Sequence, residues 1–239
     1  MKREWRPILT YLSFLLFFFV FLHTGLFLLQ FDRAKAQPTS AAAEVTFVLD
    51  AGHGGEDCGA IGVNGVLEQN LNMEMTQLLG TLLQEAGYRV VYTRTEDRLL
   101  YTEEQDIAGQ RKTYDLKNRL AIAAAEENAV LVSIHMDKFS SASASGLQVH
   151  YAGVGDSRLL ADKIQNRVRA DLQPNSRRTV KAAGEEIYLL HHATTPAVLI
   201  ECGFLSNPEE CEKLSDKDYQ RQLSFSIFCG MMEYMERKK

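Results

Sequence analysis

Along the chain, short runs of apolar residues alternate with segments in which apolar residues recur at helical spacing. The pattern predicts strands that alternate with helices. Short β-rich runs such as residues 45–49 (VTFVL) are typical of buried strands. In residues 67–86 the apolar positions recur at helical spacing, and Gly87 ends that helix. We expect strands over residues 45–49, 88–93, 129–134, 146–151, 187–190 and 197–200. We expect helices over residues 67–86, 116–127, 157–172, 208–214 and 218–236, with an irregular loop over 97–113.

Strands that alternate with helices favour an α/β fold. We predict a single domain with a central, mostly parallel or mixed sheet of about six strands and helices on both faces. This domain is assigned to residues 44–239, after a short linker over residues 37–43 (QPTSAAA). In sheets of this kind, ligands bind at the carboxyl ends of the strands.

The N-terminus has the pattern of a targeting or anchoring element. Lys2, Arg3 and Arg6 precede an apolar run over residues 8–31, and about 20 apolar residues suffice to cross a bilayer. The basic flank predicts a cytoplasmic N-terminus and export of the remainder. A small-x-small sequence at residues 34–36 (AKA) could serve a signal peptidase. Residues 1–36 are therefore a signal anchor or a signal peptide; we favour the anchor, and expect the domain to work outside the cytoplasm.

Composition narrows the function classes. The net charge of −5 over 239 residues argues against a general nucleic-acid binder, which needs a basic surface. The sequence contains no repeat with a period of 20 to 50 residues, so a solenoid or another repeat array is not expected. The four cysteines could form two disulfides in an exported protein but make no CxxC pair: Cys58, Cys202, Cys211 and Cys229. Because Cys202 and Cys229 lie in apolar segments, buried free thiols are favoured over disulfides.

Three polar residues follow strands directly and so converge on one edge of the predicted sheet. His53 lies in LDAGHGGEDCGA after the first strand, His135 follows the third, and Glu201 follows the last. Two imidazoles and a carboxylate suit a catalytic zinc site with an open position. Glu68, in the first turn of the first helix, is the best-placed third ligand. Histidines satisfied in loops or in the core are the competing interpretation; a phosphate cradle is disfavoured because neither GxxxxGK[ST] nor GxGxxG is present.

Several segments, in order, resemble the zinc-dependent N-acetylmuramoyl-L-alanine amidases of the type 3 family: LDAGHGGEDCGA, VLEQNLN, YTR, DLKNRLAIA, SIHMD and PAVLIECGFLSNPEE. The resemblance implies zinc held by His53, Glu68 and His135, with Glu201 as the catalytic carboxylate. It implies cleavage of the amide between N-acetylmuramic acid and L-alanine of the peptidoglycan stem peptide. The minimal layout, without a wall-binding module or a long helical insertion after His135, resembles the germination-specific amidases that act in spore cortex maturation, where muramic lactam forms.

One departure from the family pattern concerns substrate contacts. The sequence reads His135-Met136-Asp137 where the family usually has His-small-Asn. Asp137 either orients His135 or belongs to the substrate groove. Glu56 and Asp57 could contact the metal, but solvated loop acids are favoured.

Other charged candidates are weaker. Arg94 and Arg119 either bind peptide carboxylates or pair with Asp97 and Asp115, and the pairing is favoured. The remaining histidines are expected at a strand edge or on a rim: His150, His191 and His192.

Two alternative functions remain open at this point. One is a zinc peptidase that cuts within the stem peptide; the other is a non-catalytic wall-binding protein with the same fold. The expected cofactor is Zn²⁺. The expected partners are peptidoglycan, the membrane through the N-terminal segment and an exported protein, but no nucleic acid. The expected location is across the cytoplasmic membrane, anchored or secreted, and in the forespore or cortex space for a spore enzyme.

Overall fold

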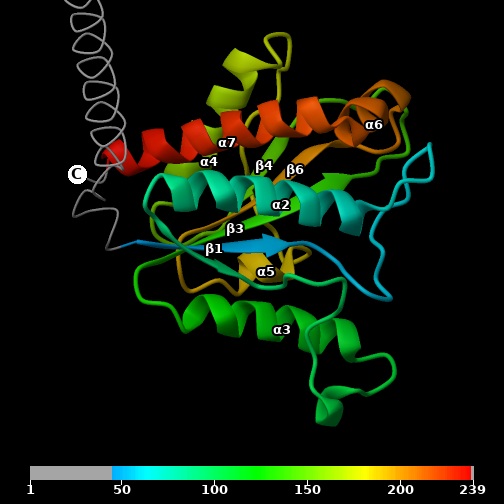
Figure 1. Cartoon of the computed structure of the whole chain (residues 1–239), viewed down its shortest axis with the longest axis vertical. Coiled ribbons are helices and arrows are strands. Elements are labelled where there is room, and N and C mark those ends of the chain that lie inside the picture. The colour runs from blue at the N-terminus through cyan, green and yellow to red at the C-terminus, as the bar shows by residue number, and fades with distance from the viewer. Residues whose placement is uncertain (1–44, 238–239) are drawn as a thin grey trace, which may run out of the picture. The chain divides into compact units, whose positions relative to one another are not determined.

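The computed structural model describes residues 45–237, and its elements are labelled in Figure 1. The strands are β1 (Thr46–Ala51), β2 (Arg89–Tyr92), β3 (Ala129–Asp137), β4 (Gln148–Tyr151), β5 (Lys181–Ala182) and β6 (Ala197–Phe204). The helices are α2 (Glu68–Glu85), the 3-10 turn η1 (Glu103–Gln105), α3 (Arg111–Ala124), α4 (Ser157–Asp171), α5 (Tyr188–His191), α6 (Pro208–Ser215) and α7 (Lys217–Arg237).

The six strands form one mixed sheet in the order β2-β1-β3-β6-β4-β5. All neighbouring pairs are parallel except β4 and β6, which run antiparallel. The predicted α/β class, with about six strands, is confirmed. Because β1, β3 and β6 are parallel neighbours, their carboxyl ends meet at one edge of the sheet.

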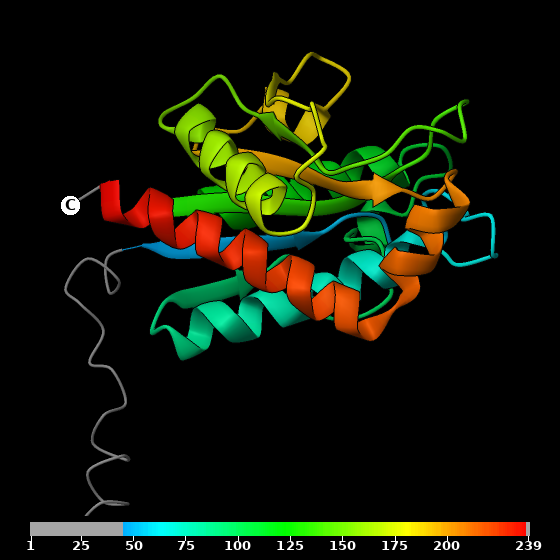
Figure 2. The same ribbon diagram turned by 90° about the horizontal axis from the view of Figure 1, so that it is seen from above.

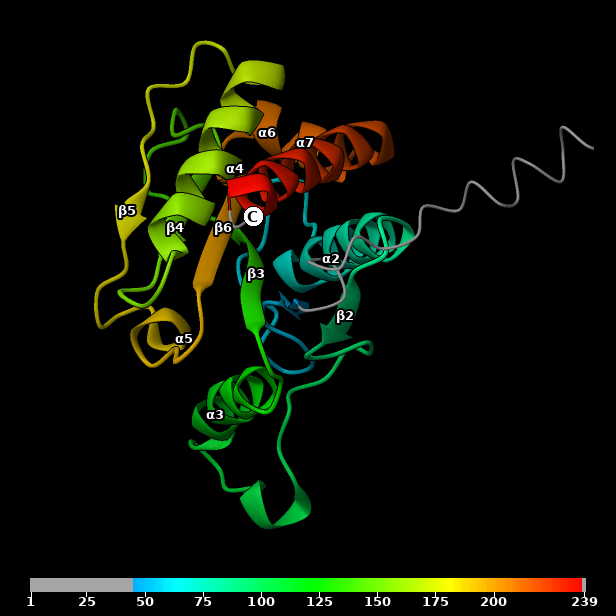
Figure 3. The same cartoon turned by 90° about the vertical axis from the view of Figure 1, so that its left-hand side faces the viewer.

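Helices cover both faces of the sheet, as predicted. In Figure 3, α2, α4 and α7 lie on one face, while α3 and α5 lie on the other. Figure 2 shows α7 crossing this first face beside α4. Strand β1 is buried along its whole length, with Phe47 and Leu49 in the larger core and Val48 in the smaller core beneath α3 and α5. Burial on both faces explains why β1 reads as an unbroken apolar run.

Two sequence-based predictions about single elements were wrong. Residues 187–190, predicted as a strand, belong to the short helix α5, where the N–H of His191 donates to the carbonyl of Ile187. A short apolar run fits either structure by periodicity alone. The place of the sixth strand is taken by β5, which pairs with the end of β4. Helix α3 also begins earlier than predicted, at Arg111 in the expected loop.

The predicted N-terminal segment, residues 1–36, and the linker over 37–43 lie outside the described residues. Within residues 45–237, no helix combines the length and the apolar character needed to span a membrane.

Candidate active site

The first candidate ligand sits on a sharply turned loop after β1. His53 has φ +63°, a left-handed conformation that is uncommon for a residue with a side chain. The structure must hold this conformation, because it costs about 1–3 kcal/mol when left unsupported. The turn brings the His53 imidazole towards the end of β3, where His135 lies, and the two ring centroids are 5.0 Å apart.

The predicted ligand residues come together in one cluster. His53 Nε2 lies 3.1 Å from Glu68 Oε1, and His135 Nδ1 lies 3.0 Å from the same oxygen. Each of the three residues offers one ligand atom, and these atoms all lie within 4.8 Å of one another. Residues 67 positions apart in the chain thus meet at the carboxyl edge of the sheet.

Glu68 is held firmly at the N-terminus of α2. Its Oε2 accepts a hydrogen bond from the Ala60 N–H at 2.8 Å. Its Oε1 accepts from Asn72 Nδ2 and from the Met136 N–H, both at 3.2 Å. Burial alone would raise the pKa of Glu68, but its hydrogen bonds with the two histidines outweigh burial and hold the pKa below its usual range. The carboxylate is therefore ionised at neutral pH.

Two glycines are required because the candidate ligands approach the backbone closely. A Cβ on Gly52 would lie 2.2 Å from the imidazole of His135. A Cβ on Gly59, whose φ is +66°, would lie 2.5 Å from Glu68 Oε2 and 2.7 Å from His53 Cδ2. Any larger residue at either position would displace a candidate ligand.

Glu201, the predicted catalytic carboxylate, projects into the same place from β6. It pairs in register with His135 of β3. A cleft of about 220 Å³ is lined by His53, His135 and Glu201, together with Lys112 and Tyr188. Glu201 Oε2 is buried and has no hydrogen-bond partner in the described part of the chain. Burial is the main cause that raises the pKa of the Glu201 carboxyl to about 7.

Asp57 contacts the imidazole of His53. The sequence interpretation favoured a solvated loop acid at this position and did not predict the contact. Asp57 Oδ2 lies 2.9 Å from His53 Nδ1 and 2.9 Å from Lys112 Nζ. The carboxylate and the imidazole form a close contact, although Nδ1 lacks a well-directed hydrogen bond. Burial would lower the pKa of His53, yet the interactions with Asp57 and Glu68 raise it to about 9. Asp57 thus contacts Nδ1 of His53, whereas Nε2 of the same ring faces Glu68. Glu56, in contrast, pairs with Arg111 at the surface, as favoured.

A buried arginine supports the His53 loop from below. Arg119 donates to Asp50 Oδ1 at 2.7 Å and to Asp115 Oδ2 at 2.8 Å, so its predicted pairing with Asp115 is confirmed. It also donates to the backbone carbonyls of Ala51 and His53, each at 2.7 Å. Arg119 is thereby a fixed brace for the left-handed turn at His53.

A second arginine, Arg94, braces the same loop through backbone contacts, and no carboxylate of the described residues forms a close ion pair with it. Arg94 donates to the carbonyls of Ala51, Gly52, Gln69 and Glu96 at 2.8 to 3.1 Å. Its predicted pairing with Asp97 is wrong: Asp97 instead accepts from the Gly55 N–H and from Gln69 Nε2. Arg94 therefore secures backbone oxygens where β1 ends and α2 begins.

Two buried polar residues of this framework escaped the sequence interpretation. Asp50 accepts hydrogen bonds from Thr93, Ser133 and Arg119. Asn72 joins Glu68 to the carbonyl of Gly52. Asp50 could have been found from the sequence, because it is a charged residue within an otherwise apolar strand. A buried charge of this kind needs hydrogen-bonding or charged partners.

The remaining candidates lie outside the ligand cluster. Asp137 Oδ1 accepts from the N–H of Lys138, a local contact that does not involve His135. His150 lies in β4, while His191 and His192 lie at α5 with ring centroids 4.9 Å apart. All four cysteines are free, as predicted, although Cys58 and Cys229 are only partly buried.

Fold and cluster together define a class of hydrolase. The model of the N-acetylmuramoyl-L-alanine amidase family (Amidase_3) matches residues 47–233, and the chain belongs to this family. It is therefore an enzyme, a peptidoglycan amidase, as the sequence resemblance implied.

Several members of the family are similar to the chain over most of its length. The germination-specific N-acetylmuramoyl-L-alanine amidase of Bacillus subtilis is 35% identical over 237 residues, covering 98% of each chain. The structure of the CwlD amidase from Clostridioides difficile, solved in complex with the GerS lipoprotein, is 37% identical with a TM-score of 0.75, covering 80% of this chain and 98% of that one. The amidase AmiC2 of Nostoc punctiforme is 27% identical with a TM-score of 0.69, covering 82% and 99%.

Proposed function

We propose that this amidase is a zinc enzyme in which His53, Glu68 and His135 hold the ion and Glu201 is the catalytic carboxylate. The observation that carries the proposal is the ligand cluster, whose atoms lie within 4.8 Å of one another beside a buried, unpartnered carboxylate oxygen of Glu201. Two imidazoles and one carboxylate are a known donor set for catalytic zinc. When bound, zinc polarises the scissile carbonyl and makes water a nucleophile at neutral pH.

The surroundings of the cluster support a metal site over an ordinary salt bridge. Glu68 is ionised and its oxygens are aimed by Ala60, Asn72 and Met136. Asp57 holds the imidazole nitrogen of His53 that does not face Glu68. A buried, ionised carboxylate next to two imidazoles is a donor set that suits a divalent cation such as zinc.

Glu201 would carry the proton in the reaction. Its Oε2 has capacity to accept a proton from the attacking water, and the carboxyl would then deliver that proton to the amine of L-alanine as the amide bond breaks. The pKa of Glu201, raised by burial to about 7, suits a group that must both take up and release a proton near neutral pH.

The biological substrate that we propose is the spore cortex. The support is the similarity, along 98% of both chains, to the germination-specific amidase of B. subtilis. The enzyme would remove stem peptides from cortex muramic acid before muramic lactam forms. Lactam analysis of cortex from a strain lacking this enzyme tests the role, since unchanged lactam content would contradict it.

Export and partnership belong to the same proposal. Residues 1–36 would direct the domain across the cytoplasmic membrane, as an anchor or a cleaved signal. The CwlD amidase of C. difficile was solved with the GerS lipoprotein, which supports an exported protein partner for this chain.

Muropeptide digestion with and without a chelator tests the chemistry. We expect intact stem peptides beginning with L-alanine, detected by mass spectrometry, and loss of activity on chelation that Zn²⁺ restores. Peptides lacking the N-terminal L-alanine would instead indicate a peptidase. In the matched variant Glu201→Gln, turnover should fall by about 10² to 10⁴ while zinc content, measured by elemental analysis, is retained. Full turnover in Glu201→Gln would contradict the assigned role.

A further inference from the structure

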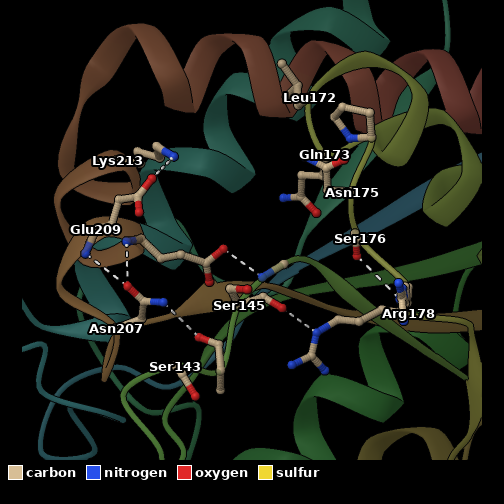
Figure 4. Close-up of a pocket in the computed structure, with 15 residues that line it drawn as sticks. Ser143, Ser145, Leu172, Gln173, Asn175, Ser176, Arg178, Asn207, Glu209 and Lys213 are labelled. Carbon is tan, nitrogen blue, oxygen red and sulfur yellow. Dashed lines mark hydrogen bonds and ion pairs between the residues drawn. The ribbon is translucent and has the colours of Figure 1, made fainter.

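A larger polar pocket lies on the same edge of the molecule, beyond the end of β6. It has a volume of about 740 Å³ and lies between the loop before β4, the loop after α4 and helix α6. Figure 4 shows its lining side chains, mostly hydroxyls, amides and charged groups, among them Ser145, Asn175, Arg178, Asn207 and Lys213. We call it the α4–α6 pocket.

Charges in the α4–α6 pocket are unevenly paired. Lys213 Nζ lies 2.7 Å from Glu209 Oε1. Glu210 accepts hydrogen bonds from the Gly146 and Phe204 N–H groups at 2.7 and 2.8 Å. Both carboxylates that line the pocket are therefore engaged. Among the described residues, no carboxylate lies within 4.0 Å of the guanidinium of Arg177 or Arg178. Neither arginine thus forms a close ion pair among the described residues, although Arg178 interacts electrostatically with Glu210 at longer range.

Arg178 is also fixed in place. Its Nε donates to the Ser145 carbonyl at 2.6 Å, and Nη1 donates to Gln148 Oε1 at 3.4 Å. Its guanidinium carbon lies 4.4 Å from the centre of the Phe204 ring. A guanidinium held on an aromatic face loses little side-chain freedom when a ligand binds, and its remaining N–H groups match the geometry of a carboxylate.

The pocket adjoins the catalytic edge through β4. Gln148, the residue that Arg178 contacts, pairs in register with Glu201, so both side chains lie on the same side of the sheet. Gly146, in the pocket wall, precedes Gln148 by two residues. The pocket therefore lies at the end of β4 that is next to Glu201.

We propose that the α4–α6 pocket is a substrate subsite that binds carboxylate groups of the peptidoglycan stem peptide, with Arg178 and Arg177 as the anion-binding residues. The inference rests on the proposed role of Glu201, because that residue fixes where the scissile amide lies. Every peptide carries a carboxylate at its C-terminus, and acidic side chains add others. The pocket would thereby favour substrates in which the stem peptide on muramic acid carries free carboxylates.

A binding measurement tests the pocket separately from catalysis. The full-length, metal-free protein is titrated with a synthetic stem peptide, L-Ala-γ-D-Glu-L-Lys-D-Ala, and with the same peptide amidated at its carboxyl groups. We expect Arg178→Gln and Arg177→Gln each to raise the Kd of the free-carboxylate peptide about tenfold, and amidation to do the same in the native protein. Arg158→Gln is the matched control: it removes an exposed arginine at the opposite end of α4.

Three outcomes would overturn the proposal. The first is equal affinity for the free and the amidated peptide. The second is unchanged affinity in both arginine variants. The third is equally tight binding of an acidic peptide of unrelated sequence, which would make the occupant an acidic segment of a partner protein. Arg177→Gln keeps the test valid if Arg178→Gln unfolds, because Arg177 forms no hydrogen bond or ion pair with the described residues.

Kinetics with a glycan-linked substrate provide the second readout. Arg178→Gln should raise KM about tenfold at unchanged kcat, and only for the substrate with free carboxylates. Failure of zinc catalysis would remove turnover from every variant but would leave the peptide titration intact, so the two proposals fail in different ways.

Discussion

The guanidinium of Arg119 donates a hydrogen bond of 2.7 Å to the backbone carbonyl of His53, the first candidate zinc ligand. The same side chain holds Asp50 and Asp115, so a left-handed turn is tied to β1 and α3 at once. The candidate site is thus supported by contacts to backbone as much as by contacts to ligand side chains.

Shortening that brace should weaken metal binding. Arg119→Lys keeps a buried positive charge but cannot reach Asp50, Asp115 and two carbonyls simultaneously. We expect zinc affinity to fall about 10- to 100-fold, measured by competition with a chromophoric chelator. The absorption spectrum of the Co²⁺-loaded protein should change as well, which a loss of stability alone would not cause. Arg89→Lys, at an exposed ion pair with Glu126, is the control and should bind zinc normally.

A single methyl group should disrupt the site at Gly52. In Gly52→Ala, the new Cβ would lie 2.2 Å from the ring of His135, so either the ring or the β1 loop must move. We expect zinc binding and muropeptide hydrolysis both to be lost. Gly153→Ala, where the Cβ meets nothing within 4 Å, should leave both intact. Normal zinc affinity in Gly52→Ala would show that the close approach has no role.

Removing the carboxylate behind His53 should act more mildly. Asp57→Asn keeps the shape of the side chain but removes the negative charge 2.9 Å from His53 Nδ1. We expect zinc affinity to fall about tenfold, with the fold unchanged by circular dichroism. Glu56→Gln, in the same loop but paired with Arg111 at the surface, should not alter zinc affinity.

Zinc should stabilise the fold only where the ligand set is complete. Binding to the folded state alone adds about 2.7 kcal/mol at a free zinc concentration 100 times Kd. We expect a rise in Tm on zinc addition to the metal-depleted native protein, and none in Glu68→Gln. An equal rise in both proteins would mean that the stabilising ion binds elsewhere.

Acid should remove the contribution of Asp50 to stability. Burial would raise the pKa of Asp50, but the charge of Arg119 and the hydroxyl donors outweigh burial and lower it to about 2. A lowered folded-state pKa contributes stability above the unfolded value of 3.8, and this contribution is lost as pH falls through about 2. Asp50→Asn should therefore destabilise by about 3–5 kcal/mol at pH 7, and the difference should shrink below pH 4. Urea unfolding across this range measures it; a constant difference would contradict the assigned ion pair.

The sequence predicted those site residues that lie near the ends of apolar strands or at the start of an amphipathic helix. His53 lies two residues after β1, His135 lies near the carboxyl end of β3, and Glu68 opens an amphipathic helix, so their convergence follows from the rule for strand ends. The contacts of Arg94, Asn72 and Asp57 were not predicted, because their partners are carbonyls and a ring nitrogen that only folding brings close. Strand β5 was missed for a similar reason: two exposed residues pair with β4 without any apolar pattern of their own.

The pairing of β1 with β3 has a consequence for how the enzyme matures. Ala51 lies opposite Ile134 in the native register, which brings His53 and His135 to one edge together. A slip of one residue would turn His135 towards the opposite face of the sheet. A chain with a shifted β1–β3 register would therefore lack the proposed zinc site and would be inactive. Zinc binding would then distinguish the native register from a shifted one.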